Sequence, residues 1–147
     1  MKTPLRQLLA HKGRRVQSCH PAQTVIEAVH LMNDLKIGAL VVFEGTRLVG
    51  IFTERDVMVR VVAKRLDPQT TRVRDVMTTS VITLAPTATV EQAMRTMIDN
   101  ACRHIPVAES DEVLGLVSLR DLSNWTVRAQ QQELDQLAGY MYRSYPN

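Results

Sequence analysis

The sequence repeats itself at a fixed offset of 65 residues, and this duplication constrains the fold more than any other feature. Residues 21–56 align with residues 86–121 without a gap, and 11 of the 36 aligned positions are identical. Ordinary composition would give about two or three identities by chance. Two copies are too few for a solenoid, in which at least three units stack, so we expect a pseudo-twofold pair that buries one shared face.

Each copy has the pattern of a small unit that mixes strands with helices. Apolar residues recur at helical spacing in residues 25–32 and again in residues 90–97. Two strand-favouring runs follow in each copy, and the short polar loop between them predicts a hairpin. Helical spacing then returns. Each copy is therefore predicted as strand, helix, strand, strand, helix, with residues 67–78 joining the two copies.

Both copies contain the same junction between their last strand and the helix that follows, Gly-h-h-Thr/Ser-x-x-Asp, where h is apolar. The hydroxyl and the carboxylate are spaced as in a helix capping box, which is one interpretation of the pattern. In the other interpretation, the glycine permits close approach of another group, the helix N-terminus binds a phosphate, and the carboxylate accepts hydrogen bonds from a ribose diol. The pattern is consistent with both.

Several motifs in order resemble a pair of CBS domains, the cystathionine β-synthase-type repeats of a Bateman module. They are the lead-in "VRDVMT" at residues 73–78, the strands "IGALVV" and "RHIPV", and the two junctions. The resemblance covers about residues 3–126. It implies an α/β (α+β) fold of two βαββα repeats about a pseudo-twofold axis, with a C-terminal helix in addition. The expected divisions are repeat 1 at 3–66, repeat 2 at 67–126 and a helical tail at 127–147.

The resemblance also implies two clefts between the repeats that take adenosine-containing ligands: AMP, ADP, ATP, NAD(H) or S-adenosylmethionine. Such a ligand would be regulatory, and no cofactor is required. Thr53 and Asp56 would line one cleft, and Ser118 and Asp121 the other, with the hydroxyl on phosphate and the carboxylate on ribose. Backbone groups and side chains beside the adenine would come from Ile51, Thr78 and Cys102 in the first cleft, and from Ile37 and Leu116 in the second. Apolar residues at these positions are equally compatible with the core.

The two copies differ at one position that bears on phosphate binding. Arg103 in the second copy aligns with Gly38 in the first. A guanidinium offers a fork of donors suited to phosphate oxygens, so we expect the Ser118/Asp121 cleft to prefer the more highly phosphorylated ligand or to be the only one occupied. The alternative is that Arg103 is a solvated residue at a strand edge. Arg55 and Arg120 are also repeated. Each is expected either to contact phosphates or to pair with neighbouring acidic residues.

Composition favours a soluble recognition module over an enzyme or a membrane protein. The longest nearly apolar run, residues 37–43, is far short of the roughly 20 residues of a membrane helix, and no signal-peptide pattern begins the chain, so a cytoplasmic location is expected. Cys19 and Cys102 have no metal-type spacing and are expected to be free thiols. No catalytic set and no metal site are predicted, because the repeated hydroxyl–carboxylate pair suits recognition better than bond making.

The net charge of +3 and an aromatic content of only 4% argue against nucleic acid as a partner. The alternative function is nevertheless a structural or nucleic-acid-binding dimer, in which the junctions are only helix caps. An apolar stripe at residues 57–62 and another on the tail, at Leu134, Leu137 and Met141, predict a homodimer. The stripes would otherwise complete the monomer core, with the tail folded back. An effector protein of unknown identity is expected to receive the signal.

Overall fold

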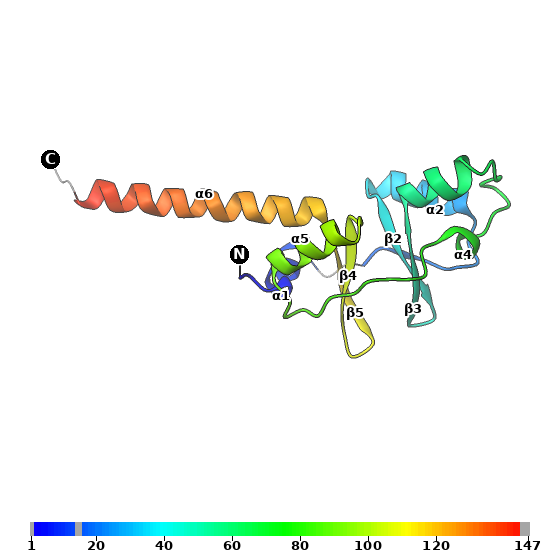
Figure 1. Ribbon diagram of the computed structural model, residues 1–147, viewed down its shortest axis with the longest axis horizontal. Coiled ribbons are helices and arrows are strands. Elements are labelled where there is room, and N and C mark those ends of the chain that lie inside the picture. Colours follow the sequence, from blue (N-terminus) through cyan, green and yellow to red (C-terminus); the bar gives the residue numbers. More distant parts are fainter. Residues whose placement is uncertain (1, 14–15, 145–147) are drawn as a thin grey trace.

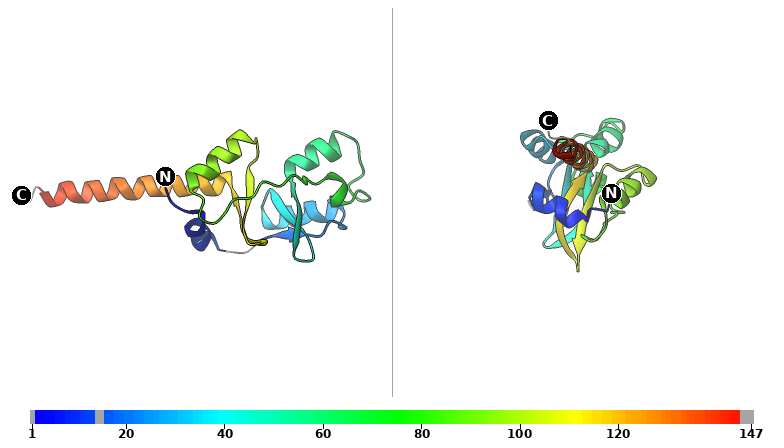
Figure 2. Two further views of the ribbon diagram at one scale, coloured as in Figure 1. Left: turned by 60° about the horizontal axis from the view of Figure 1, so that its bottom comes forward. Right: turned by 90° about the vertical axis from the view of Figure 1, so that its left-hand side faces the viewer.

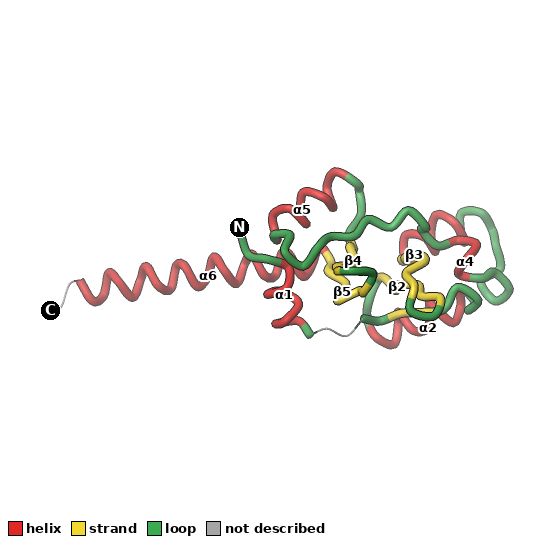
Figure 3. Tube along the Cα trace, turned by 90° about the horizontal axis from the view of Figure 1, so that it is seen from below, coloured by secondary structure: helices red, strands yellow, loops and turns green. Residues whose placement is uncertain are grey.

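The computed structural model describes residues 2–13 and 16–144 of the chain. The two repeats lie side by side along the long axis of the molecule, and one long helix extends from the end that the second repeat occupies (Figure 1). Figure 3 shows the strands of both repeats next to one another in the middle of the body. The predicted pair of α/β units is confirmed.

The first repeat contains a three-stranded sheet in the order β1-β2-β3, with β1 parallel and β3 antiparallel to β2. Its elements are β1 (Ser18–Cys19), α2 (Val25–Leu35), β2 (Ala39–Glu44), β3 (Arg47–Thr53), the short α3 (Glu54–Asp56) and the π-helical η1 (Val57–Val62). The second repeat has α5 (Val90–Asp99), β4 (His104–Glu109), β5 (Glu112–Ser118) and α6 (Leu119–Ser144).

The two hairpins share a detail of backbone geometry, while the sheets to which they belong differ in strand number. Both hairpins have an irregularity in register at the equivalent step, between Val42 and Phe43 in one and between Val107 and Ala108 in the other. The predicted first strand of the second repeat is reduced to a single parallel bridge from Leu84 to Val107. The second sheet therefore has two strands where the first has three.

Helices α2 and α5 begin where the sequence predicts, and each begins with a capping box. The Thr24 hydroxyl accepts a hydrogen bond from the amide of Glu27 at 3.3 Å, and the Glu27 carboxylate accepts one from the amide of Thr24 at 3.1 Å. Thr89 and Gln92 make the same pair of bonds at the start of α5. These bonds satisfy two amide groups that would otherwise lack partners in the first turn.

Each repeat has its core completed by the segment that precedes the other repeat in sequence. Helix α1 (Leu5–Lys12) inserts three buried leucines among the core residues of the second repeat. Helix α4 (Val73–Val76) inserts Val73 and Val76, which are 0% and 2% exposed, into the core of the first repeat. Figures 1 and 2 show α1 beside the second repeat and α4 beside the first. This exchange ties the two repeats into one unit.

The glycines of the two junctions allow the close approach that the sequence suggests, but the approaching groups belong to the chain itself. A Cβ atom on Gly50 would lie 2.6 Å from the Met77 Sδ and 2.9 Å from the Thr78 carbonyl oxygen. A Cβ atom on Gly115 would lie 2.5 Å from a methyl group of Leu9. The glycines therefore accommodate the exchanged lead-in segments.

The last helix of the second repeat and the predicted tail form one continuous helix, α6. The boundary expected at residues 126 and 127 falls inside it. Its second half extends away from both repeats rather than folding back over them (Figure 2). Leu134, Leu137 and Met141 are 60%, 61% and 69% exposed. Neither α6 nor any other helix within residues 2–13 and 16–144 is long and apolar enough to span a membrane.

Candidate functional site

The junction of the first repeat is a complete capping box. The Thr53 hydroxyl accepts a hydrogen bond from the Asp56 amide at 3.2 Å, and the Asp56 carboxylate accepts one from the Thr53 amide at 3.0 Å. The capping interpretation of the sequence pattern is thus confirmed at this junction. It does not exclude a second role, because a carboxylate has about four lone-pair positions.

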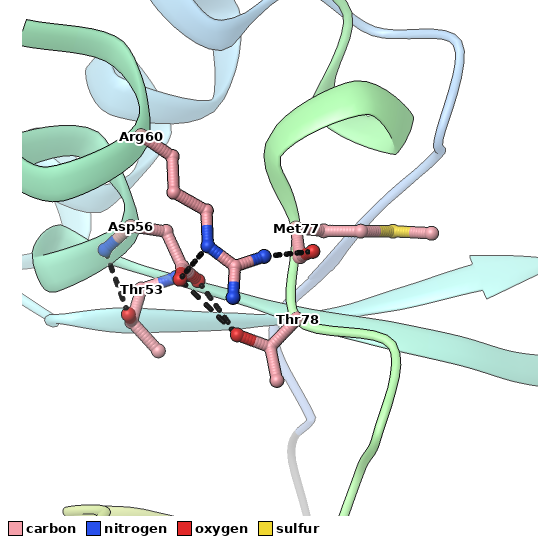
Figure 4. Close-up of polar contacts among 5 residues, drawn as sticks. All are labelled: Thr53, Asp56, Arg60, Met77 and Thr78. Carbon is pink, nitrogen blue, oxygen red and sulfur yellow. Dashed lines mark hydrogen bonds and ion pairs between the residues drawn. The ribbon is translucent and has the colours of Figure 1, made fainter. Parts of the chain in front are cut away.

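The Asp56 carboxylate is also surrounded by other side chains of the protein (Figure 4). The Thr78 hydroxyl donates to its Oδ1 at 3.1 Å, and the Arg60 Nε lies 3.7 Å from the same oxygen. Backbone hydrogen bonds of 2.9 Å in both directions join Ile51 to Thr78. The structure therefore brings together four of the five residues expected in the first cleft, and Asp56 is only 7% exposed.

The fifth of these residues, Cys102, packs against the core of the second repeat instead of joining this cluster by a hydrogen bond in the described structure. Its amide donates to the Met97 carbonyl at 3.0 Å, and burial raises the pKa of its thiol. Cys19 is more deeply buried, and burial raises the pKa of that thiol to about 11. Both cysteines are free, as the sequence predicts.

The junction of the second repeat makes the same capping box but has a different neighbour. The Ser118 hydroxyl accepts from the Asp121 amide at 3.1 Å, and the Asp121 carboxylate accepts from the Ser118 amide at 2.8 Å. Lys12, from α1, donates to the Asp121 Oδ2 at 2.5 Å and to the Leu116 carbonyl at 2.8 Å. Partial burial raises the pKa of Asp121, but the bonds from Lys12 and Ser118 outweigh it and lower that pKa overall.

A cleft of about 820 Å³ opens beside Asp121, and residues of both repeats line it. This volume lies within the range of small-molecule sites. All five residues expected in the second cleft line it: Ile37, Arg103, Leu116, Ser118 and Asp121. Its lining also includes Lys12, Gln17, Lys36, Gly38, Ala39, Glu54, His104, Leu119, Arg120 and Ser123.

The lining of this cleft carries four basic side chains, namely those of Lys12, Lys36, Arg103 and Arg120, against the two carboxylates of Glu54 and Asp121. Burial lowers the pKa of the half-buried His104 imidazole, which also lines the cleft, and the nearby Glu54 offsets this only in part. An excess of positive charge in a concave site favours anionic ligands.

Arg103 and Gly38, the aligned pair that differs in its capacity to bind phosphate, both line this cleft. Arg103 is exposed, immediately precedes β4, and its carbonyl accepts a hydrogen bond from the Leu119 amide at 2.8 Å. The equivalent Gly38 faces the Glu54 carboxylate, whose atoms would lie 3.1 Å from a Cβ there. Arg103 is thus both a strand-edge residue and a cleft residue. Arg120 also lines the cleft, whereas Arg55 is exposed on α3.

Sequence patterns alone missed several residues of the cleft, above all Lys12. A signal for it exists, because Lys12 aligns at the 65-residue offset with Met77, inside the lead-in motif of the second repeat. No group of three or more His, Cys, Asp and Glu side chains in the described part of the chain is placed to hold a metal ion.

A family model for the CBS domain matches residues 12–63 and 73–127. The chain belongs to the CBS domain family. A curated relative, the mitochondrial CBS domain-containing protein CBSX3 of Arabidopsis thaliana, is 34% identical over 97% of this chain and 74% of its own length. The expectation of a CBS pair is thereby confirmed.

Solved CBS domain structures agree with the fold. A putative signal-transduction protein with CBS domains from Burkholderia ambifaria superposes with a TM-score of 0.84 at 32% identity, covering 87% of this chain and 96% of its own. A hexameric CBS-CP12 protein from bloom-forming cyanobacteria gives a TM-score of 0.71 at 29% identity, covering 81% of this chain and 68% of its own.

Proposed function

We propose that this CBS pair is a regulatory module that binds an adenosine-containing ligand in the cleft beside Asp121 and passes the signal to a separate effector protein. The observation that carries the proposal is the cleft itself. It joins the repeated hydroxyl–carboxylate junction, apolar residues of both repeats and an excess of basic side chains in about 820 Å³.

The chemistry of the cleft suits a nucleotide. The Asp121 carboxylate is a natural acceptor for the two hydroxyls of a ribose, as acidic residues are in dinucleotide sites. Guanidinium groups such as those of Arg103 and Arg120 bind phosphate oxygens through paired donors. Ile37 and Leu116 offer apolar contact to an adenine ring. The ligand classes are AMP, ADP, ATP, NAD(H) and S-adenosylmethionine.

The two junctions are not equivalent in this proposal. Asp56 already receives bonds from the Thr53 amide and the Thr78 hydroxyl and lies near Arg60, and it is almost fully buried. A ligand at Asp56 would have to replace these neighbours at a nearly closed position. Asp121 is bonded by the Ser118 amide and by Lys12, but it borders a cleft of ligand size, so a ligand there has to displace only the Lys12 ammonium. The Asp121 cleft is therefore the working site.

The role is regulatory and not catalytic, in keeping with the family. Asp121 lies in the first turn of α6, so a ligand held there touches the helix that extends out of the body. A ligand shifts a conformational equilibrium only by the difference in its affinity for the two states. A homodimer is the unit in which that shift is expressed, and exposed apolar side chains on η1 and α6 form its interface.

A thermal-shift panel with matched variants tests the proposal. AMP, ADP, ATP, NAD, NADH and S-adenosylmethionine are each added to the wild type, to Asp121→Asn and to Asp56→Asn. At about 100 times its dissociation constant, a ligand of the native state stabilises by about 2.7 kcal/mol, which corresponds to at least about 5 °C in Tm. We expect a shift in the wild type and in Asp56→Asn, and none in Asp121→Asn.

The second candidate function is a structural or nucleic-acid-binding dimer. It is favoured by one observation, that in both junctions the hydroxyl and the carboxylate cap the helix by accepting from each other's backbone amides. Absence of a thermal shift with every adenosine compound, together with RNA or DNA binding that falls steeply with salt, would support it over the nucleotide proposal.

A further inference from the structure

Lys12 supplies a positive charge at the point in the cleft where a ribose would meet Asp121. It comes from α1, 109 residues away in sequence, and its ammonium group contacts both the Asp121 carboxylate and the Leu116 carbonyl. Its side chain is 39% exposed, so it lies at the cleft surface and is accessible to a ligand. An ammonium has three donors, so a third remains for another acceptor.

The first repeat has no such charge at the equivalent position. Lys12 aligns with Met77, and the next position in that lead-in is Thr78, whose neutral hydroxyl bonds Asp56. The two junctions therefore differ in the charge that the lead-in segment provides and at the aligned pair Arg103 and Gly38. The basic group near Asp56 is Arg60, which comes from its own helical segment and lies 3.7 Å away.

The ion pair between Lys12 and Asp121 discriminates among ligands by charge. A neutral nucleoside that bonds Asp121 through its ribose competes with Lys12 and offers the displaced ammonium no anionic partner. A phosphorylated ligand takes the same carboxylate but provides phosphate oxygens for the ammonium. A cationic ligand such as S-adenosylmethionine adds charge to a cleft in which basic side chains already outnumber carboxylates.

We infer that Lys12 is a specificity-determining residue that restricts the Asp121 cleft to ligands carrying phosphate groups. The inference rests on the proposed function, which it narrows to the phosphorylated members of the adenosine class. The other basic side chains that line the cleft also favour phosphate. The Glu54 carboxylate, which lies against Gly38, opposes it.

Calorimetric titration with ATP, adenosine and S-adenosylmethionine tests the inference on four proteins. They are the wild type, Lys12→Met, Lys12→Arg, which keeps the charge, and Lys64→Met. Lys12→Met introduces the residue found at the aligned position 77. Lys64 is exposed and is not among the residues that line the cleft, so it is the matched control.

We expect the wild type to bind ATP at least about tenfold more tightly than adenosine, since a charge-assisted hydrogen bond contributes about that factor. Lys12→Met should reduce this preference by about tenfold, mainly through weaker ATP binding. Lys12→Arg and Lys64→Met should keep it. Equal weakening of ATP and adenosine in Lys12→Met, or a wild type that binds both equally well, would overturn the inference.

Tripolyphosphate, titrated into the same proteins, separates this inference from the proposed function. If no adenosine compound binds while tripolyphosphate binds the wild type more tightly than Lys12→Met, the proposed function fails and the selection for phosphate stands. If adenosine compounds bind and Lys12→Met leaves the affinities for both tripolyphosphate and ATP unchanged, the inference fails and the proposed function stands.

Discussion

At the scale of the residue, one short motif gives two aspartates with different chemistry. Asp56 and Asp121 cap their helices with the same pair of bonds. The remaining acceptor capacity of Asp56 meets the Thr78 hydroxyl, and that of Asp121 meets the ammonium of Lys12. The two sites therefore differ through lead-in segments that are far away along the chain, and also through Arg60, which lies 3.7 Å from the Asp56 carboxylate.

The lowered pKa of Asp121 predicts a specific loss of stability in acid. Asp121 contributes to the free energy of unfolding above its unfolded pKa, which is near the ordinary value of 3.8. This contribution is lost as the pH falls through the lower pKa of the folded state. Lys12→Met should raise the pKa of Asp121, since it removes both the hydrogen bond and the charge. A carboxyl carbon NMR titration measures this. Lys64→Met serves as the control, and an unchanged Asp121 pKa in Lys12→Met would contradict the ion pair.

At the scale of the element, the strand-to-helix junctions depend on close contact with the exchanged lead-in segments. The two junction glycines meet different kinds of atoms. Gly50 faces the Thr78 carbonyl oxygen, a backbone atom, while Gly115 faces the end of a flexible leucine side chain. Backbone cannot yield as readily as a side-chain terminus, so the two sites should tolerate a methyl group unequally.

Alanine at each glycine measures that difference. We expect Gly50→Ala to lower the free energy of unfolding by about 1–3 kcal/mol and Gly115→Ala by less. Gly139→Ala is the control, because a Cβ there meets nothing within 4 Å on the exposed helix α6, and alanine favours helix by about 1 kcal/mol. Urea unfolding gives all three values. A Gly50→Ala protein as stable as the wild type would show that Thr78 does not lie against β3.

The elements that sequence predicts well are those set by local pattern. Helices α2 and α5 begin at their capping threonines, and the hairpins follow from alternating strand runs around polar loops. The exchange of α1 and α4 was not predictable in this way, since short apolar segments carry no signal of the core that they join. Lys12 was missed although its alignment with Met77 of the lead-in motif is a signal, because the ungapped repeat begins only at residue 21. The residues expected in the second cleft came from the resemblance to CBS domains, and the structure places all five along one cleft.

At the scale of the whole molecule, the exposed apolar surface predicts self-association. On η1, Val61 is buried, but Met58 and Val62 are 60% and 66% exposed. The core therefore uses only part of this stripe. The outer half of α6 makes few contacts with the body, and an isolated helix of this length is marginal in water. A partner surface over these residues would stabilise both.

We expect analytical ultracentrifugation at micromolar concentration to give twice the chain mass of 16.6 kDa. Leu134→Glu combined with Leu137→Glu should shift the protein toward the monomer, because the charges fall on the exposed apolar stripe. Gln132→Glu adds a charge to the same helix at a polar position and should leave the mass unchanged. A wild-type mass of 16.6 kDa at this concentration would contradict the homodimer.

A crystal structure with ATP at saturating concentration would show whether one of the two pseudo-equivalent junctions binds an adenosine phosphate. We expect the ribose at the Asp121 carboxylate and the phosphates among Lys12, Arg103 and Arg120. Nucleotide density beside Asp56 instead, or at neither junction, would contradict it.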